Sequence, residues 1–254
     1  SRQEKDLVVD LNLKAGLKAK AATAYAAAAD YLKTGVKFLP GQPWQDHYDL
    51  TYALRAELME CEYLIRHFEA SEALFAEIAR NAKNKNDRAK ACRTMIELYT
   101  NIGKSSDAIA LGIENLKQFG VHLSPNAGKL AVVKELMRFK WYLHKYTLDQ
   151  IVEQPMMTSE ESLWITELCG AIGTPAYFTN PNLFAVTVRK AINTYSGTLI
   201  NASAFGFMAA AVIIGSALGD HRMAMRIGGM AMRLNDRLDT KPYGAKVHLL
   251  YAFM

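Results

Sequence analysis

The stretch Tyr99-Thr-Asn-Ile-Gly-Lys-Ser-Ser-Asp-Ala108 decides the fold of this chain. A glycine stands four positions after its aromatic residue, and an alanine stands five positions after that glycine. Gly103 permits a tight turn between two helices because glycine adopts positive φ at no steric cost. Ala108 is small and lets the second helix approach the first closely. The stretch therefore predicts a pair of helices joined by a tight turn.

The same spacing recurs elsewhere in the chain. Gly219 and Ala224 repeat the interval of five residues. Arg66 and Ser71 form a weaker copy, with arginine where glycine is expected. Ser71 and Ala108 are 37 residues apart, and Ala108 and Ala224 are 116 apart, close to three such units. Periods of this size are typical of helix pairs stacked in an α-solenoid.

Composition favours an all-α fold around a sizeable core. Of the 254 residues 50% are apolar and 22% are charged, which excludes a disordered tail, a collagen-like fibre and a small disulfide scaffold. None of the 7 prolines lies between Trp44 and Ser124, where an all-β or parallel α/β fold would need regular turns. Periodicity predicts about eleven antiparallel helices, at 17–39, 44–66, 70–82, 88–101, 107–119, 129–146, 160–172, 183–195, 204–218, 223–237 and 246–253.

Charge, cysteines and hydropathy indicate the setting of the chain. The formal net charge of +5 is compatible with weak attraction to anions, and the lysines of 14–20 are interpreted as a solvated helix face. Cys61, Cys92 and Cys169 are isolated and odd in number, so we expect reduced thiols. The most apolar stretch, 205–218, has 14 residues and is too short to span a bilayer. These features predict a cytoplasmic protein with no membrane span and no nucleic-acid partner.

The unit around Gly103 resembles a tetratricopeptide repeat. The residues at its packing positions are Cys92, Met95, Ile96, Tyr99, Ala108 and Gly112. The unit around Gly219 resembles one too, whereas the Ser71 unit lacks the glycine and has Glu62 at the aromatic position. Between residues 123 and 201 the predicted helices are longer and the signature is absent.

Nearly the whole chain resembles one helical region of large signalling proteins. The residues that carry the resemblance are Ala22, Tyr25 and Ala29; Trp44 and Tyr48; Glu57, Glu60, Tyr63 and Leu64; Pro155-Met156-Met157; 176–184; and Leu218-Gly219-Asp220-His221. They are similar to the region that follows the AAA-type ATPase module in bacterial and fungal signalling proteins. Those proteins often carry a serine/threonine kinase domain before this region, and sensor and histidine kinase domains after it. The resemblance implies that residues 1–254 form a single tetratricopeptide-like domain, a right-handed superhelix acting as a sensor, scaffold or transmission arm.

The two ends of the sequence lead us to expect a piece of a longer protein. The chain starts at Ser1 without Met, inside a predicted helix, and stops at Met254 in the apolar run HLLYAFM. On this interpretation the segment itself is not an enzyme. Any kinase or ATPase activity of the parent protein would reside in its other parts.

The chemical motifs in the sequence predict no catalytic residue, cofactor or metal. Gly103-Lys104-Ser105 matches the end of a phosphate loop, but its leading glycine would fall on Leu98 in a helix, so an inter-helix turn is the better interpretation. The six histidines show no H-E-x-x-H and no paired-cysteine spacing. No nucleophile has an evident base partner. Glu57 and Glu60 share a helix face, as carboxylates on solvated faces often do.

A protein or peptide, or a flanking domain of the same chain, is the expected partner. On the tetratricopeptide pattern, the concave face of the Gly103 unit carries Lys90, Arg93, Glu97 and Asn101. These side chains could hold an acidic or carboxylate-bearing peptide; the alternative is an unused solvated face. The corresponding face of the Gly219 unit is apolar, with Ala209 and Ile213.

A small-molecule sensor is the second hypothesis. The residues that motivate it are Trp44, Tyr48 and Tyr177, with the methionine-rich stretch 222–233, because methionine side chains form adaptable binding surfaces. However, one helix face of that stretch carries Met223, Ile227, Met230 and Leu234, the pattern of a buried stripe.

Overall fold

A computed structural model describes residues 2–192, 197–238 and 241–254 of the chain. Within these ranges the fold is all-α. Fourteen helices and no strand lie in these ranges, with one isolated parallel bridge between Met156 and Leu199. The all-α prediction is therefore confirmed. The end of the predicted helix at 183–195 falls on residues 193–195, outside the described ranges.

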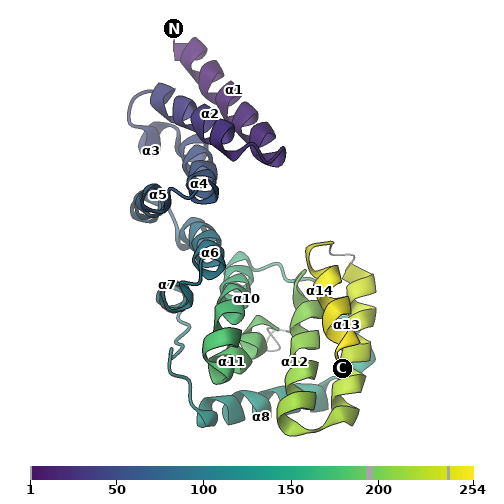
Figure 1. Cartoon of the computed structure of the whole chain (residues 1–254). Helices are drawn as coiled ribbons and strands as arrows, with labels where there is room; N and C mark the ends of the chain where they lie inside the picture. The colour runs from purple at the N-terminus through teal and green to yellow at the C-terminus, as the bar shows by residue number, and fades with distance from the viewer. Residues whose placement is uncertain (1, 193–196, 239–240) are drawn as a thin grey trace. The chain divides into compact units, whose positions relative to one another are not determined.

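Two compact units make up the chain, residues 1–98 and 99–254. The first contains α1 (Arg2–Ala21), α2 (Tyr25–Phe38), α3 (Pro43–Asp46), α4 (Tyr48–Leu64), α5 (Phe68–Asn81) and most of α6 (Lys85–Asn101) (Figure 1). The second contains the end of α6, then α7 (Ser105–Lys117), α8 (Lys129–Lys145), α9 (Leu148–Val152), α10 (Glu160–Thr179), α11 (Pro181–Ala191), α12 (Ser203–Leu218), α13 (His221–Leu238) and α14 (Lys241–Ala252). The single domain and the superhelix stay predictions.

Each unit has an apolar core of its own. In the first unit, Leu32, Leu54, Met59 and Ile78 are at most 1% exposed. In the second unit, the fully buried Phe207 of α12 stacks on Tyr142 of α8, with ring centroids 6.4 Å apart. Each core forms because helices bury one apolar face against their neighbours.

The methionine-rich helix α13 contributes to the second core. Ile227, Met230 and Leu234 are at most 2% exposed, and Met223 is partly buried against the same cluster. The predicted buried stripe is therefore confirmed.

One turn geometry recurs between consecutive helices. It contains a residue with positive φ: Thr23 at 60°, Arg66 at 70°, Gly103 at 78° and Gly219 at 67°. At the first three sites, the backbone N–H of the residue after the positive φ donates to the carbonyl five residues before it. These hydrogen bonds are Ala24 to Ala19 at 2.9 Å, His67 to Glu62 at 2.8 Å and Lys104 to Tyr99 at 2.9 Å. Five residues after each positive φ stands a small, buried side chain: Ala28, Ser71, Ala108 and Ala224. The spacing read from the sequence thus corresponds to a repeated turn.

The predicted helix 17–39 is wrong, because two helices occupy this region. α1 ends at Ala21 and α2 begins at Tyr25. The intervening sequence has no glycine or proline to mark the turn, and Thr23 takes a left-handed conformation that β-branched residues rarely adopt. This break and the two short helices α3 and α9 account for the difference between about eleven predicted helices and fourteen described ones.

Replacing Thr23 by glycine is expected to stabilise the first unit by about 1 kcal/mol. Left-handed backbone costs a non-glycine residue about 1–2 kcal/mol, and the greater freedom of glycine in the unfolded chain offsets part of that gain. The urea midpoint, followed by circular dichroism, measures the change. The matched control is Ala22→Gly in the same turn, where φ is not positive, and it should lower the midpoint. Equal shifts for the two variants would contradict the assignment of strain to Thr23.

Candidate functional site

A groove lies between α4 and α6 in the first unit. Its volume is about 350 Å³, and the residues that line it are Tyr48, Asp49, Tyr52, Ala53, Ala56, Glu57, Glu60, Asp87, Lys90, Ala91 and Thr94. Those of α4 recur every three or four residues, so they share one face of the helix. The short side chains of Ala53, Ala56 and Ala91 leave the space open. The groove therefore has a small apolar floor between polar walls.

Two tyrosines fix one end of the groove to Asp87. The Tyr48 hydroxyl donates to Asp87 Oδ2 at 2.6 Å and accepts from the Lys83 N–H at 3.0 Å. The Tyr52 hydroxyl donates to the Asp87 carbonyl at 2.8 Å. Burial, together with the Asp87 carboxylate, raises the pKa of Tyr48 to about 12 and raises that of Tyr52 as well. Both phenols are therefore protonated donors at neutral pH, suited to holding the wall rather than to proton transfer.

A lysine from α1 bridges two carboxylates of the groove. Lys20 Nζ lies 2.7 Å from Glu57 Oε2 and 2.7 Å from Glu60 Oε2. Burial acts to lower the pKa of Lys20, but the two carboxylates outweigh it and the net shift is upward. The bridge holds Glu57 and Glu60 in fixed positions on the groove wall.

The lining carries more negative than positive charge. Its four carboxylates are Asp49, Glu57, Glu60 and Asp87, and its one cation is Lys90. Counting also Lys20 and Lys83, whose Nζ lies 4.2 Å from the Tyr48 ring centroid, four negative charges face three positive ones. The groove is thus polar, aromatic and slightly acidic.

The predicted concave residues are only partly brought together. Lys90 lines the groove, with its Nζ 5.7 Å from the Tyr52 ring centroid. Arg93 and Glu97 are not among the lining residues and form an ion pair at 2.9 Å. Asn101 is exposed at the end of α6, in the second unit. A binding role for these four residues stays a prediction.

The α4 wall is the part of the site that the sequence alone did not indicate. Glu57 and Glu60 share a helix face, and the same spacing extends to Asp49, Tyr52 and Ala53. That spacing was a usable signal, but it required knowing that α6 lies opposite.

The three aromatic residues of the sensor hypothesis do not line a common cavity in either unit. Trp44 and Tyr48 belong to the first unit, where the Trp44 indole donates to Glu77 Oε1 at 2.9 Å. Tyr177 belongs to α10 of the second unit and contacts Phe178 and Phe184, with ring centroids 5.1 and 5.3 Å away. In the predicted apolar face of α12, Ala209 is buried in the core and Ile213 lines a separate apolar cavity.

Groups that often carry chemistry occupy structural positions elsewhere. Burial raises the pKa of the Cys61 thiol to about 11 and that of Cys169 to about 12, so both are protonated at neutral pH. Gly103 forms the turn after α6, and Lys104 Nζ lies 5.3 Å from the Tyr99 ring centroid, as the inter-helix interpretation predicted. In the described ranges no three His, Cys, Asp or Glu side chains are grouped to hold a metal ion.

Comparison with known proteins gives one distant similarity over nearly the whole chain. The chain is 23% identical over 278 aligned positions to hybrid signal transduction histidine kinase G of Dictyostelium discoideum, with 95% of this chain covered. It spans 8% of the length of that relative. No protein-family model matches the chain, and no solved structure matches it. Of the helices described here, none is both long and apolar enough to cross a membrane.

Proposed function

We propose that this chain is a non-catalytic helical interaction module of a signal-transduction protein. The similarity to a hybrid histidine kinase over 95% of the chain supports a signalling role. The repeated turn at Thr23, Arg66, Gly103 and Gly219 supports a tetratricopeptide-like superhelix. In this proposal the chain is a cytoplasmic scaffold that relays state to flanking ATPase or kinase domains, which carry the enzymatic activity of the parent.

The groove between α4 and α6 is the observation that carries the proposal. An extended peptide would lie on the alanine floor, with its polar groups facing the tyrosine hydroxyls and the charged walls. Because the four carboxylates of the lining outnumber the three cations Lys90, Lys20 and Lys83, a segment with lysine or arginine side chains is the better match. This reverses the acidic peptide expected from Lys90 and Arg93 alone.

Charge-reversal variants test whether the groove binds the peptide and whether its net charge is negative. Peptides selected on the chain from a displayed random library are labelled, and their affinities are measured by fluorescence anisotropy. Asp49→Lys is expected to weaken binding about fivefold, and Lys90→Glu to strengthen it by a similar factor, since each changes one exposed charge pair worth about 1 kcal/mol.

The matched control is Asp30→Lys, which makes the same substitution at an exposed aspartate of α2 that does not line the groove. It should leave the affinity unchanged. Stronger binding by Asp49→Lys together with weaker binding by Lys90→Glu would indicate an acidic peptide as the ligand instead. A library that yields no peptide sensitive to any groove variant would contradict the groove as the interaction site.

A further inference from the structure

The outer face of α8, in the second unit, carries an exposed apolar stripe. Leu130 is 87% exposed, Val133 50%, Met137 67% and Trp141 65%. These positions follow one another at intervals of three, four and four residues, so they lie along a single face of the helix. A row of four large apolar side chains in water is unusual for a monomeric surface and is typical of a binding site.

Cations flank this stripe on both sides. At 100° per residue, Lys134 and Lys145 lie on one side of it, and Lys129 and Lys140 on the other. All four are exposed. Lys145 Nζ lies 5.6 Å from the Trp141 ring centroid, which places a positive charge at the end of the stripe. The exposed face is therefore apolar along its centre and positive along its edges.

The acidic residue of α8 does not reduce this positive charge at the surface. Glu135 is 6% exposed, and its Oε1 lies 2.7 Å from Arg138 Nη1. Its Oε2 lies 3.9 Å from Nε of Arg189, which is also buried. The glutamate is thus compensated on the inner side of the helix.

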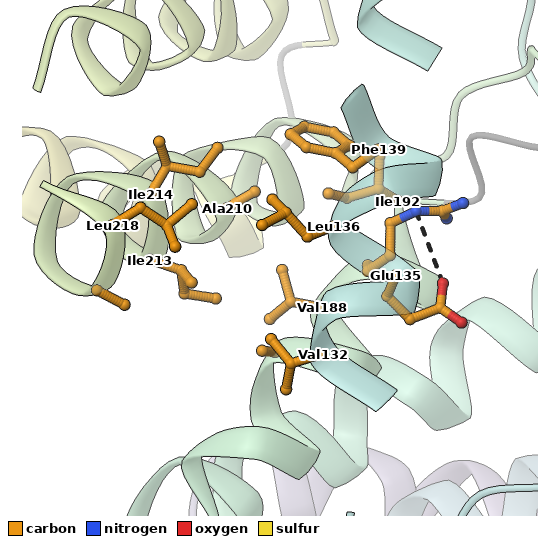
Figure 2. Close-up of a pocket in the computed structure, with 13 residues that line it drawn as sticks. Val132, Glu135, Leu136, Phe139, Val188, Ile192, Ala210, Ile213, Ile214 and Leu218 are labelled. Carbon is orange, nitrogen blue, oxygen red and sulfur yellow. Dashed lines mark ion pairs between the residues drawn. The ribbon is translucent and has the colours of Figure 1, made fainter. Parts of the chain in front are cut away.

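An apolar cavity of about 90 Å³ adjoins the stripe. Figure 2 shows Val132, Leu136 and Phe139 of α8 facing Ile213, Ile214 and Leu218 of α12, with the Glu135 carboxylate pointing away from the space between them. Leu218 is 49% exposed, so the cavity opens to solvent at its rim. Around the axis of α8, Val133 lies between the cavity-lining Leu136 and the outer Met137. The apolar surfaces of the cavity and the stripe therefore meet at the middle of α8, between the turns that carry Lys129 and Lys140.

We infer that α8 and this cavity form a docking surface for an acidic amphipathic helix of a partner protein. The apolar face of such a helix covers the α8 stripe, one aliphatic side chain enters the cavity, and its Asp and Glu residues meet the flanking lysines. The recess favours a protruding side chain over a flat lipid surface. A second copy of this chain would present the same lysines and repel the first.

The test uses helical peptides displayed with leucine at a fixed i, i+3, i+4, i+7 spacing and all other positions randomised. After selection on the chain, the peptides are expected to be enriched in Asp and Glu. Met137→Glu and the double variant Lys134→Glu/Lys140→Glu should each weaken the selected peptides at least about tenfold, as at a central contact of an interface. Raising NaCl from about 0.05 to about 0.5 M should weaken them as well.

The control is Met225→Glu on α13, an equally apolar residue that is 48% exposed in the same unit and does not line the cavity. It should bind the peptides like the unmodified chain, and unchanged circular dichroism should show that every variant folds. Peptides without acidic enrichment, or insensitive to Met137→Glu, would overturn the inference. So would α8-dependent sedimentation with phosphatidylserine vesicles in place of peptide binding, or a dimer that Met137→Glu dissociates. These readouts involve α8 alone, so they are independent of the α4–α6 groove.

Discussion

Replacing Lys33 and His67 together by alanine should destabilise the first unit by about 3 kcal/mol. Both side chains contact Glu62, whose side chain is only 2% exposed: Lys33 Nζ lies 2.6 Å from Oε1 and His67 Nδ1 lies 2.8 Å from Oε2. Without them a carboxylate is left buried and uncompensated. Lys33 and His67 are themselves about half exposed, so water can replace part of what they supply, and we expect the lower end of the range for such losses. The urea midpoint measures the effect.

The informative control is the triple variant that also carries Glu62→Gln. It removes the charge that the double variant leaves behind, so it should recover a large part of the lost stability, although the double variant has more native side chains. A triple variant less stable than the double variant would show that the buried charge is not the cause.

The same carboxylate predicts that the stability of the first unit depends on pH in the acidic range. Burial acts to raise the pKa of Glu62, but the hydrogen bonds from Lys33 and His67 outweigh it, and the pKa lies below its ordinary value of 4.5. A group whose pKa is lowered on folding contributes stability above its unfolded pKa and loses that contribution as pH falls through its folded pKa. The contribution should therefore be complete above about pH 5 and decline below it, and Glu62→Gln should flatten this part of the stability curve.

Phe207→Ala is expected to destabilise the second unit by about 4 kcal/mol. Phe207 is fully buried, with the Tyr142 ring 6.4 Å and the Phe139 ring 6.3 Å from its own, centroid to centroid. Its truncation removes apolar burial and leaves a cavity beside the Tyr142 and Phe139 rings. In a Trp44→Phe background the remaining tryptophans, Trp141 and Trp164, both belong to residues 99–254. Their fluorescence in urea then reports on this unit alone.

The matched control is Phe178→Ala, which deletes the same atoms from a side chain that is 75% exposed in the same unit. It should change stability by less than about 0.5 kcal/mol. Similar losses for the two variants would contradict the placement of Phe207 at the centre of the core.

Much of the fold was predictable because its signals are local. Gly103 and Gly219 mark their turns, and the spacing of Ile227, Met230 and Leu234 identifies the buried face of α13. The turn at Thr23 was not predictable, because no glycine marks its left-handed backbone. Arg66 departed from the pattern in sequence but adopts the same positive φ as the glycines.

The groove was harder to predict than the helices. Lys90 was identified from the face of one helix, whereas the opposite wall comes from α4, some 30 to 40 positions earlier in the chain. Which helix faces α6 depends on tertiary packing. The net charge of the groove also depends on this packing, because Asp49, Glu57 and Glu60 lie on the α4 wall.

Six hydrogen-bonded pairs in the first unit have a similar separation along the chain. Lys20–Glu57, Trp44–Glu77, Tyr48–Lys83, Tyr48–Asp87, Tyr52–Asp87 and Tyr63–Leu98 span 33 to 39 residues, close to the repeat period of 37. Each hairpin is therefore bonded to the next one and to none further away in this set. In a structure with such nearest-neighbour coupling, each hairpin interacts mainly with the hairpins next to it. A displacement applied at one hairpin would pass step by step to the next. Removing Tyr48–Asp87 alone would weaken this coupling without interrupting it, because Tyr48–Lys83 and Tyr52–Asp87 join the same parts of the chain.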